Sequence, residues 1–225
     1  MNGSEIGQHV IAHLGPYSIH LDTLIISWIV MALLVVGSWL ITRHLKKMPR
    51  GFQNMLEVLV EFLENLLKEN MSPQGYSAFP YIATLFLFIL FSNLMGVIPG
   101  LVIPELKSPT GDINVTFGMA LVVFILSQAY SIKARGGKGY LLSFFKPNPL
   151  FLPLNLIEQV TRPLTLAFRL FGNIFAGEVL LIILYILVPV LIPMVWSAFS
   201  IFIGVIQAYL FVMLGIAYIS SAIEE

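Results

Sequence analysis

The chain has 225 residues, of which 58% are hydrophobic and only 11% charged, and its mean hydropathy is +0.90. Soluble domains carry about a quarter charged residues, so this composition predicts an all-α integral membrane protein. The formal net charge is zero, and no basic patch with interleaved aromatic residues indicates nucleic acid as a partner. The absence of cysteine excludes disulfides, thiolate catalysis and cysteine-ligated metals.

Several apolar runs reach the roughly 20 residues of helix that span a bilayer. The first covers residues 24–42 and ends at the basic stretch "TRHLKKMPRG". It lacks the basic start and the cleavage site of a signal peptide, so we expect a retained span. Further spans are expected at 80–98 and at 114–132, and "KARGGKG" closes the second of these.

Residues 51–69 follow a different pattern. The apolar residues recur every three or four positions, and the charged residues share the opposite face: Phe52, Met55, Leu56, Leu59, Leu63, Leu66 and Leu67 against Glu57, Glu61, Glu64 and Lys68. This pattern predicts an amphipathic helix on a membrane surface or against partner helices. It favours a subunit of a complex over a monomer.

The last third of the chain is almost continuously apolar and is interrupted by Pro189 and Pro193 in "VPVLIP". We therefore expect two long helices, at 154–187 and 194–222, joined near these prolines. Each exceeds the length of a perpendicular span, so both should be steeply tilted or bent. No internal repeat is visible, and residues 1–225 are expected to form a single membrane domain.

Basic residues predict the orientation. They follow the first span at Arg43, Lys46, Lys47 and Arg50, and the third span at Lys133, Arg135, Lys138 and Lys146. The positive-inside rule puts both clusters in the cytoplasm. The amino terminus and the loop 99–114 then face outward.

Charged residues persist inside the first long helix, in "TRPLTLAFRLFGNIFAGEVL". At 100° per residue, one narrow stripe joins Arg169 with Glu158, Arg162, Thr165, Asn173 and Ala176. Glu178 falls about 180° away from Arg169, which predicts two separate water-accessible regions on opposite sides of the helix. Ionisable residues at bilayer depth are costly and usually functional, so Arg169 and Glu178 are the main candidates. For Glu158 and Arg162, near the start of the helix, we expect an interfacial ion pair.

The last helix carries a second stripe, within about 60° of Gln207, made of Ser200, Gly204, Gln207, Gly215, Tyr218 and Ser221. Glycine permits close helix contacts, and a buried glutamine usually hydrogen-bonds across helices. We expect the two long helices to pack along these stripes, with Gln207 near Arg169 or Asn173. Both amides could serve either packing or channel lining.

Other polar residues indicate no further site. The four histidines, His9, His13, His20 and His44, match no metal motif and are expected, like Asp22, to be surface residues. "RGGKGY" lacks the glycine spacing and the Lys-Ser/Thr ending of a phosphate loop, so no nucleotide site is predicted. We expect no metal and no cofactor.

Three stretches, "SPTGDINVTFGMAL", "PLTLAFRLFGNIFAGEVLL" and "IQAYLFVMLGIAYIS", closely resemble the a subunit of the F-type ATP synthase membrane sector, in its bacterial and plastid branches. The likeness covers nearly the whole chain, and "RLFGN" followed by "AGE" is its most specific part. It implies a stator for rotary proton transfer in a bacterial plasma membrane. The implied partners are a c-ring of small hairpin subunits, the peripheral-stalk b subunits and the rest of the complex.

The resemblance also implies roles for individual residues. The essential arginine of the family falls on Arg169, its outer-channel carboxylate on Glu178, and its two amides on Asn173 and Gln207. Asp112 with Asn114 matches the outer polar opening, and Arg162 with Thr165 matches the inner half-channel. Family members often carry a second ionisable group in the last helix, where this chain has Ser200.

The physical chemistry of arginine fits this role. A ring carboxyl group facing lipid stays protonated, because a carboxylate there is costly, and a nearby positive charge favours its ionised form. Arginine keeps its charge when partly buried, so Arg169 could attract the carboxylate without relaying protons itself.

Two other interpretations remain open. A secondary transporter or stand-alone ion channel would use Arg169 to bind an anionic substrate, but it predicts internal repeats and discontinuous helices. A purely structural scaffold would tolerate Arg169→Leu.

Overall fold

The computed structural model describes residues 11–14, 17–43, 51–97, 108–145, 148–188 and 191–224. Its long elements are the helices α1 (Leu21–Thr42), α2 (Phe52–Asn70), α3 (Phe79–Val97), α4 (Ile113–Ser143), α5 (Leu152–Leu187) and α6 (Leu191–Glu224). Within these described residues, five helical stretches are long and apolar enough to cross a membrane, and α2 is not among them. The all-α membrane fold with one amphipathic helix is thereby confirmed. His9, His44, Lys46, Lys47, Arg50, Lys146 and Pro189 lie outside the described residues.

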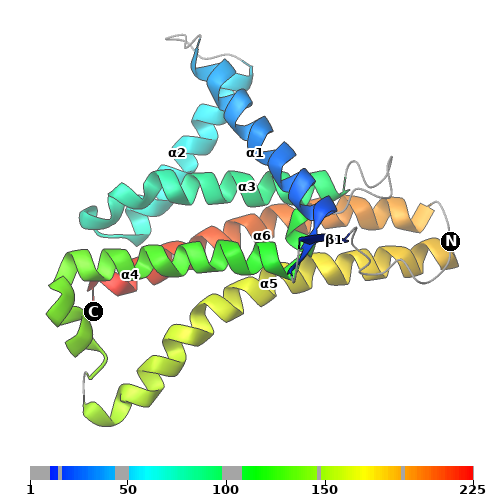
Figure 1. Ribbon diagram of the computed structural model, residues 1–225. Helices are drawn as coiled ribbons and strands as arrows, with labels where there is room; N and C mark the ends of the chain where they lie inside the picture. Colours follow the sequence, from blue (N-terminus) through cyan, green and yellow to red (C-terminus); the bar gives the residue numbers. More distant parts are fainter. Residues whose placement is uncertain are drawn as a thin grey trace.

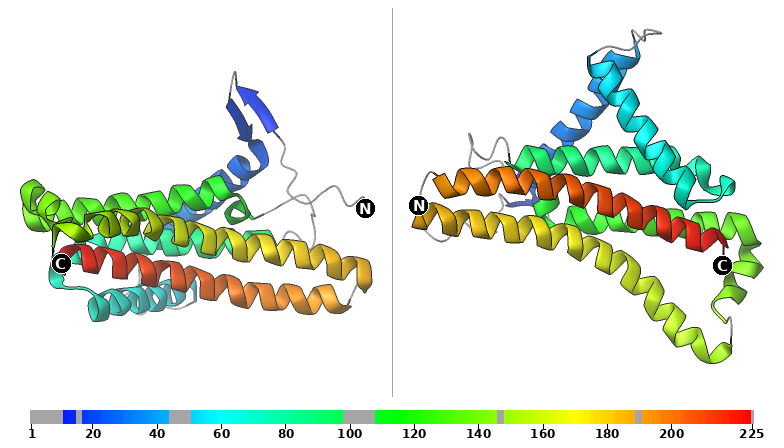
Figure 2. Two further views of the ribbon diagram at one scale, coloured as in Figure 1. Left: turned by 90° about the horizontal axis from the view of Figure 1, so that it is seen from below. Right: turned by 180° about the vertical axis from the view of Figure 1, so that it is seen from behind.

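Four helices, α3, α4, α5 and α6, run side by side, and α1 and α2 rise from them as an inclined pair (Figure 1). The C-terminal half of α5 runs beside the N-terminal half of α6, whereas the N-terminal half of α5 diverges from the other helices (Figure 2). Pro163 lies inside α5, where its missing N–H and its ring disturb helical hydrogen bonding. The expected bend is therefore present in α5.

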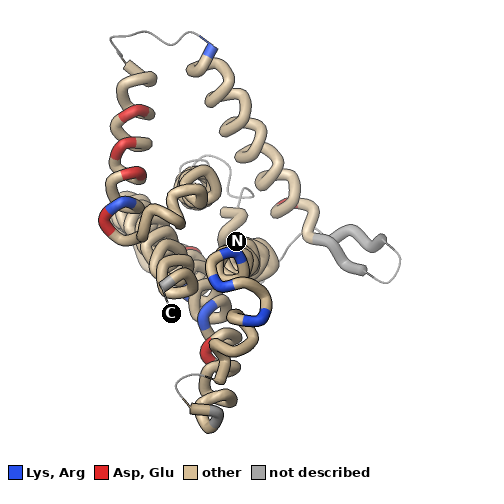
Figure 3. The backbone as a smooth tube through the Cα atoms, turned by 90° about the vertical axis from the view of Figure 1, so that its left-hand side faces the viewer, with Lys and Arg blue, Asp and Glu red and all other residues tan. Residues whose placement is uncertain are grey.

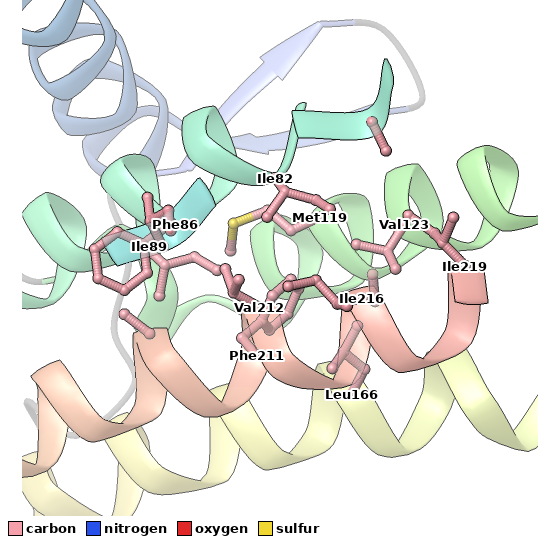
Figure 4. Packing of buried hydrophobic residues seen from close by; sticks show 14 of the residues in the cluster. Ile82, Phe86, Ile89, Met119, Val123, Leu166, Phe211, Val212, Ile216 and Ile219 are labelled. Carbon is pink, nitrogen blue, oxygen red and sulfur yellow. The ribbon is translucent and has the colours of Figure 1, made fainter. Parts of the chain in front are cut away.

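The core is centred on α6, which contacts α3, α4 and α5 (Figure 4). Phe211, Ile216 and Ile219 of α6 are almost completely buried, as are Ile89 of α3 and Leu166 of α5. Interdigitated side chains of this kind fix how the helices pack, since in lipid the helices gain little from hydrophobic burial alone. The core thus sets the positions from which polar side chains of α5 and α6 project.

The amphipathic character of α2 is confirmed. Leu63, Leu66 and Leu67 are buried against the rest of the molecule, whereas Phe52 and Met55, on the same apolar side, are exposed. The acidic residues recur along the other side of α2, and α1 beside it is uncharged between its ends (Figure 3). Only the C-terminal part of the apolar face of α2 is therefore covered by this chain.

Two features go beyond the sequence prediction. The helix expected at 114–132 continues to Ser143 as α4, but it is broken at Gly136, whose φ of 72° is readily adopted only by glycine. Before α1, the strands β1 (Ile11–Leu14) and β2 (Tyr17–His20) pair antiparallel, with Ile11 opposite His20. This hairpin was not predicted, and it brings the chain to His20 immediately before α1.

Candidate proton-transfer site

The predicted polar stripe of α5 forms an uncovered face of the helix. Four residues of the stripe are exposed: Glu158, Thr165, Arg169 and Ala176. Leu166, Ala167 and Leu170, which project about 60° to 160° away from Arg169, are buried. Arg169 makes no hydrogen bond or ion pair with any residue that the structure describes. A long apolar helix therefore presents an arginine on a surface that this chain leaves open.

The expected ion pair near the start of α5 is confirmed. Arg162 Nη2 lies 2.7 Å from Glu158 Oε1, and the guanidinium lies 5.6 Å from the centre of the Tyr218 ring of α6. Glu158 therefore neutralises Arg162 locally, one turn away on the same helix. Arg169 lies two turns beyond Arg162, too far along the helix for Glu158 to neutralise its charge as well.

Glu178 addresses a different surface from Arg169, as the helical projection predicts. Its side chain is half-buried against the short helix η3 (Pro109–Gly111), and a Cβ placed on Gly111 would lie 3.1 Å from Glu178 Oε1. The absence of a side chain at Gly111 therefore allows this carboxyl group to approach the backbone before α4. Trp196 of α6 holds the same part of α5, since its Nε1 donates to Gly177 O at 3.2 Å.

Asp112 lies next to Gly111 and caps α4. Its Oδ1 accepts hydrogen bonds from the Asn114 backbone N–H at 2.9 Å and from Asn114 Nδ2 at 3.0 Å. Its Oδ2 lies 2.6 Å from Nδ1 of His20, at the start of α1. Burial by itself would raise the pKa of the Asp112 carboxyl, but the Asn114 amide and the His20 ring, with the Thr23 hydroxyl, outweigh it and hold the pKa below its ordinary value of 3.8.

Replacing Asp112 with asparagine tests this arrangement. Asparagine caps a helix about as well as aspartate, so the substitution removes the charge and keeps the cap. A lowered folded-state pKa stabilises the fold above pH 3.8, and this stabilisation is lost as the pH falls through the lowered value. Thermal denaturation in detergent should show Asp112→Asn less stable by about 1–3 kcal/mol near neutral pH, with the difference vanishing in acid. A difference that is independent of pH would contradict the charge-based explanation.

A buried polar network holds η3 in place. Thr110 Oγ1 donates to Asn93 Oδ1 of α3 at 2.7 Å, and Asn93 Nδ2 donates to Gly204 O of α6 at 2.9 Å. Ser108 Oγ lies 2.6 Å from Thr110 Oγ1 and donates to Ser92 O at 3.0 Å. Because these side chains are buried, each unmade bond would be costly. The network therefore fixes the backbone on which Gly111 meets Glu178.

The prediction that α5 and α6 pack along their two polar stripes is confirmed only where Arg162 lies over the Tyr218 ring, and is wrong for the two glycines of the α6 stripe. Gly204 of α6 faces Asn93 of α3 and Gly215 faces Val123 of α4, while most of the α5 stripe is exposed. Because the two glycines have no side chain, the bulkier side chains of α3 and α4 can pack closely against α6 at these positions. Gln207 is buried, and its Nε2 has no partner in the described part of the chain, so no hydrogen bond joins it to Arg169 or Asn173. Ser200 and Asn173 are half-buried.

Comparison with known proteins decides the family. The family model described as ATP synthase A chain matches residues 24–220. The chain belongs to the ATP synthase subunit a family. It is 41% identical to ATP synthase subunit a of Moorella thermoacetica over 214 residues, which cover 95% of both chains. It is 42% identical to ATP synthase subunit a of Desulforamulus reducens over 218 residues, which cover 92% of this chain and 81% of the relative.

Family membership makes this chain a multi-pass membrane subunit of ATP synthase and accounts for its apolar helices. Two residues that the sequence did not predict as part of the site are His20 and Asn93, which the structure places beside Asp112 and Thr110. His20 was expected to be a plain surface residue. Its partner, Asp112, lies 92 residues away, so the local sequence could not reveal the contact. The only local indication of a role was the position of His20 directly before an apolar span.

Proposed function

We propose that this subunit is the stator that passes protons between two offset half-channels and the carboxyl groups of a rotating c-ring, coupling ion flow to ATP synthesis. The observation that supports it most is that Arg169 is exposed and makes no hydrogen bond or ion pair with a described residue, on a helix of 36 residues of which only a small fraction is buried. A lone arginine facing lipid would be strongly unfavourable. A partner with a carboxyl group at bilayer depth would supply the missing charge.

The outer half-channel would lead past Asp112 and Asn114 to Glu178. Glu178 is half-buried and touches the backbone beside Asp112, so polar groups of α1, α4 and α5 converge at this end of the bundle. Proton transfer needs a group that can gain and lose a proton near ambient pH, and Glu178 is the titratable member of α5 placed there.

The inner half-channel would follow the exposed face of α5 past Thr165 and the pair of Arg162 with Glu158. Asn173 lies between Arg169 and Glu178 along α5, and Ser200 and Gln207 lie on α6. Gln207 Nε2, which has no hydrogen-bond partner among the described residues, is compatible with a water or a side chain of another subunit at this depth. Arg169 would separate the two half-channels, since it keeps its charge and blocks a direct leak.

We infer that residues 1–225 form one membrane domain in a bacterial plasma membrane, with the amino terminus outside and the basic loops cytoplasmic. The b subunits of a peripheral stalk would hold it, and the exposed apolar residues Phe52 and Met55 of α2 offer a surface for a partner or for lipid. Catalysis of ATP synthesis would reside on other chains.

Proton uptake into vesicles tests the function. Vesicles containing the complete complex should acidify when ATP is added, and vesicles whose complex lacks this chain should not. A secondary transporter or stand-alone channel would instead move its ion without ATP and without the ring. ATP-independent transport by the purified chain alone would therefore refute the stator role.

A further inference from the structure

His20 is an ionisable residue that the proposed half-channels do not use. Its imidazole lies at the surface of the chain, against the buried end of the bundle: 27% of the side chain is exposed, whereas the Asp112 side chain that it contacts is 3% exposed. The ring therefore connects the surface of the chain with a buried carboxylate.

The contact determines which ring nitrogen carries the hydrogen. An ionised carboxylate can only accept hydrogen bonds, so His20 Nδ1, 2.6 Å from Asp112 Oδ2, must donate. In the neutral ring, Nε2 then carries the lone pair that can accept a proton. A carboxylate behind Nδ1 also stabilises the imidazolium that forms when Nε2 is protonated.

The pair lies close to Glu178. Asp112 contacts His20. Gly111 directly precedes Asp112 in the chain, and the Glu178 carboxyl group lies against Gly111. Among the described residues, the acidic groups on the elements meeting here are Asp22 of α1, Asp112 and Glu178. An imidazole and the carboxyl group of Glu178 thus flank two consecutive residues at one end of the bundle.

We propose that His20 is a proton-transfer residue at the outer mouth of the path to Glu178. This inference rests on the proposed function. His20 Nε2 accepts one proton from external water and becomes an imidazolium, and the same proton then leaves Nε2 for water on the way to Glu178. The ring returns to its neutral form, Nδ1 keeps its hydrogen throughout, and Asp112 stays ionised. Histidine suits this step because a neutral imidazole has one nitrogen that donates a hydrogen bond and one that can accept a proton.

The test is His20→Asn in the complete complex in vesicles, with ATP synthesis driven by an imposed proton gradient. Asparagine keeps an N–H donor near the position of Nδ1 but cannot titrate, so it preserves the tie to Asp112 and removes the proton acceptor. The rate should fall about tenfold when the outer compartment is neutral or alkaline, and the loss should shrink in acid, where protons are abundant. A wild-type rate and pH profile would show that His20 only ties α1 to Asp112.

His13→Asn is the matched control, because it removes a histidine from the same amino-terminal segment; its rate should match wild type. Chemical modification provides a readout that needs no variant. Diethylpyrocarbonate added to the outer face of the wild-type complex should lower the rate in proportion to His20 modification, measured by mass spectrometry, and hydroxylamine should restore it. A full rate with His20 largely modified would overturn the inference. Absence of proton coupling in the wild-type complex would instead refute the proposed function.

Discussion

Complexes carrying Arg169→Ala are expected to assemble fully and to lose ATP-driven proton uptake by about 100-fold or more. Assembly should persist because the Arg169 side chain is exposed on α5 and makes no hydrogen bond or ion pair with a described residue. Transport should fail because no positive charge would then favour the ionised form of a ring carboxyl group. Fluorescence quenching of a pH-sensitive dye in vesicles measures uptake, and co-purification with the ring measures assembly.

Two further variants separate charge from position. Arg169→Lys keeps a positive charge that can be lost on desolvation, so it should recover only a small part of the uptake. Arg162→Ala removes an arginine from the same helix whose charge Glu158 already neutralises, so its loss should be clearly smaller than that of Arg169→Ala. Undiminished uptake by Arg169→Ala would mean that the arginine is structural and that the family resemblance misleads about its role.

Glu178→Gln is expected to slow proton uptake by about tenfold or more without affecting assembly. Glutamine has nearly the same shape, so the approach of the side chain to Gly111 can be kept, but the amide cannot accept and release a proton. Rates of ATP-driven uptake, measured over a range of pH with co-purification as the assembly check, provide the comparison.

Glu64→Gln is a matched control for this experiment. Glu64 is a half-exposed carboxylate on α2, 2.6 Å from Lys68 Nζ and outside the proposed path. Such surface pairs contribute little, so its uptake should equal that of wild type. Wild-type rates for Glu178→Gln at every pH would count against a proton-relay role for Glu178.

Much of the fold could be predicted because membrane helices are encoded locally. Runs of about 20 apolar residues predict spans wherever they occur, and a three-to-four repeat predicts the amphipathic α2. The pairing of Arg162 with Glu158 and the separation of Arg169 from Glu178 follow from helical geometry within α5 itself. These features depend only on residues a few turns apart.

Which helix faces which depends instead on the packing of the whole bundle. The α6 glycines could have met any neighbour, and the structure places Gly204 against Asn93 of α3 and Gly215 against Val123 of α4. The sequence could not predict the break at Gly136 either, since a glycine inside a helical pattern permits a positive φ without requiring it.

The sequence by itself determined the membrane-protein class, the spans, the polar stripe of α5 and the family. Only the tertiary structure decided that His20 contacts Asp112, that Glu178 lies against Gly111, and that Asn93 and Thr110 hold that loop. The physical reason is the range of the interactions. Helical periodicity repeats over a few residues, whereas the His20 contact joins residues 92 positions apart, and its formation depends on how α1 docks on the bundle.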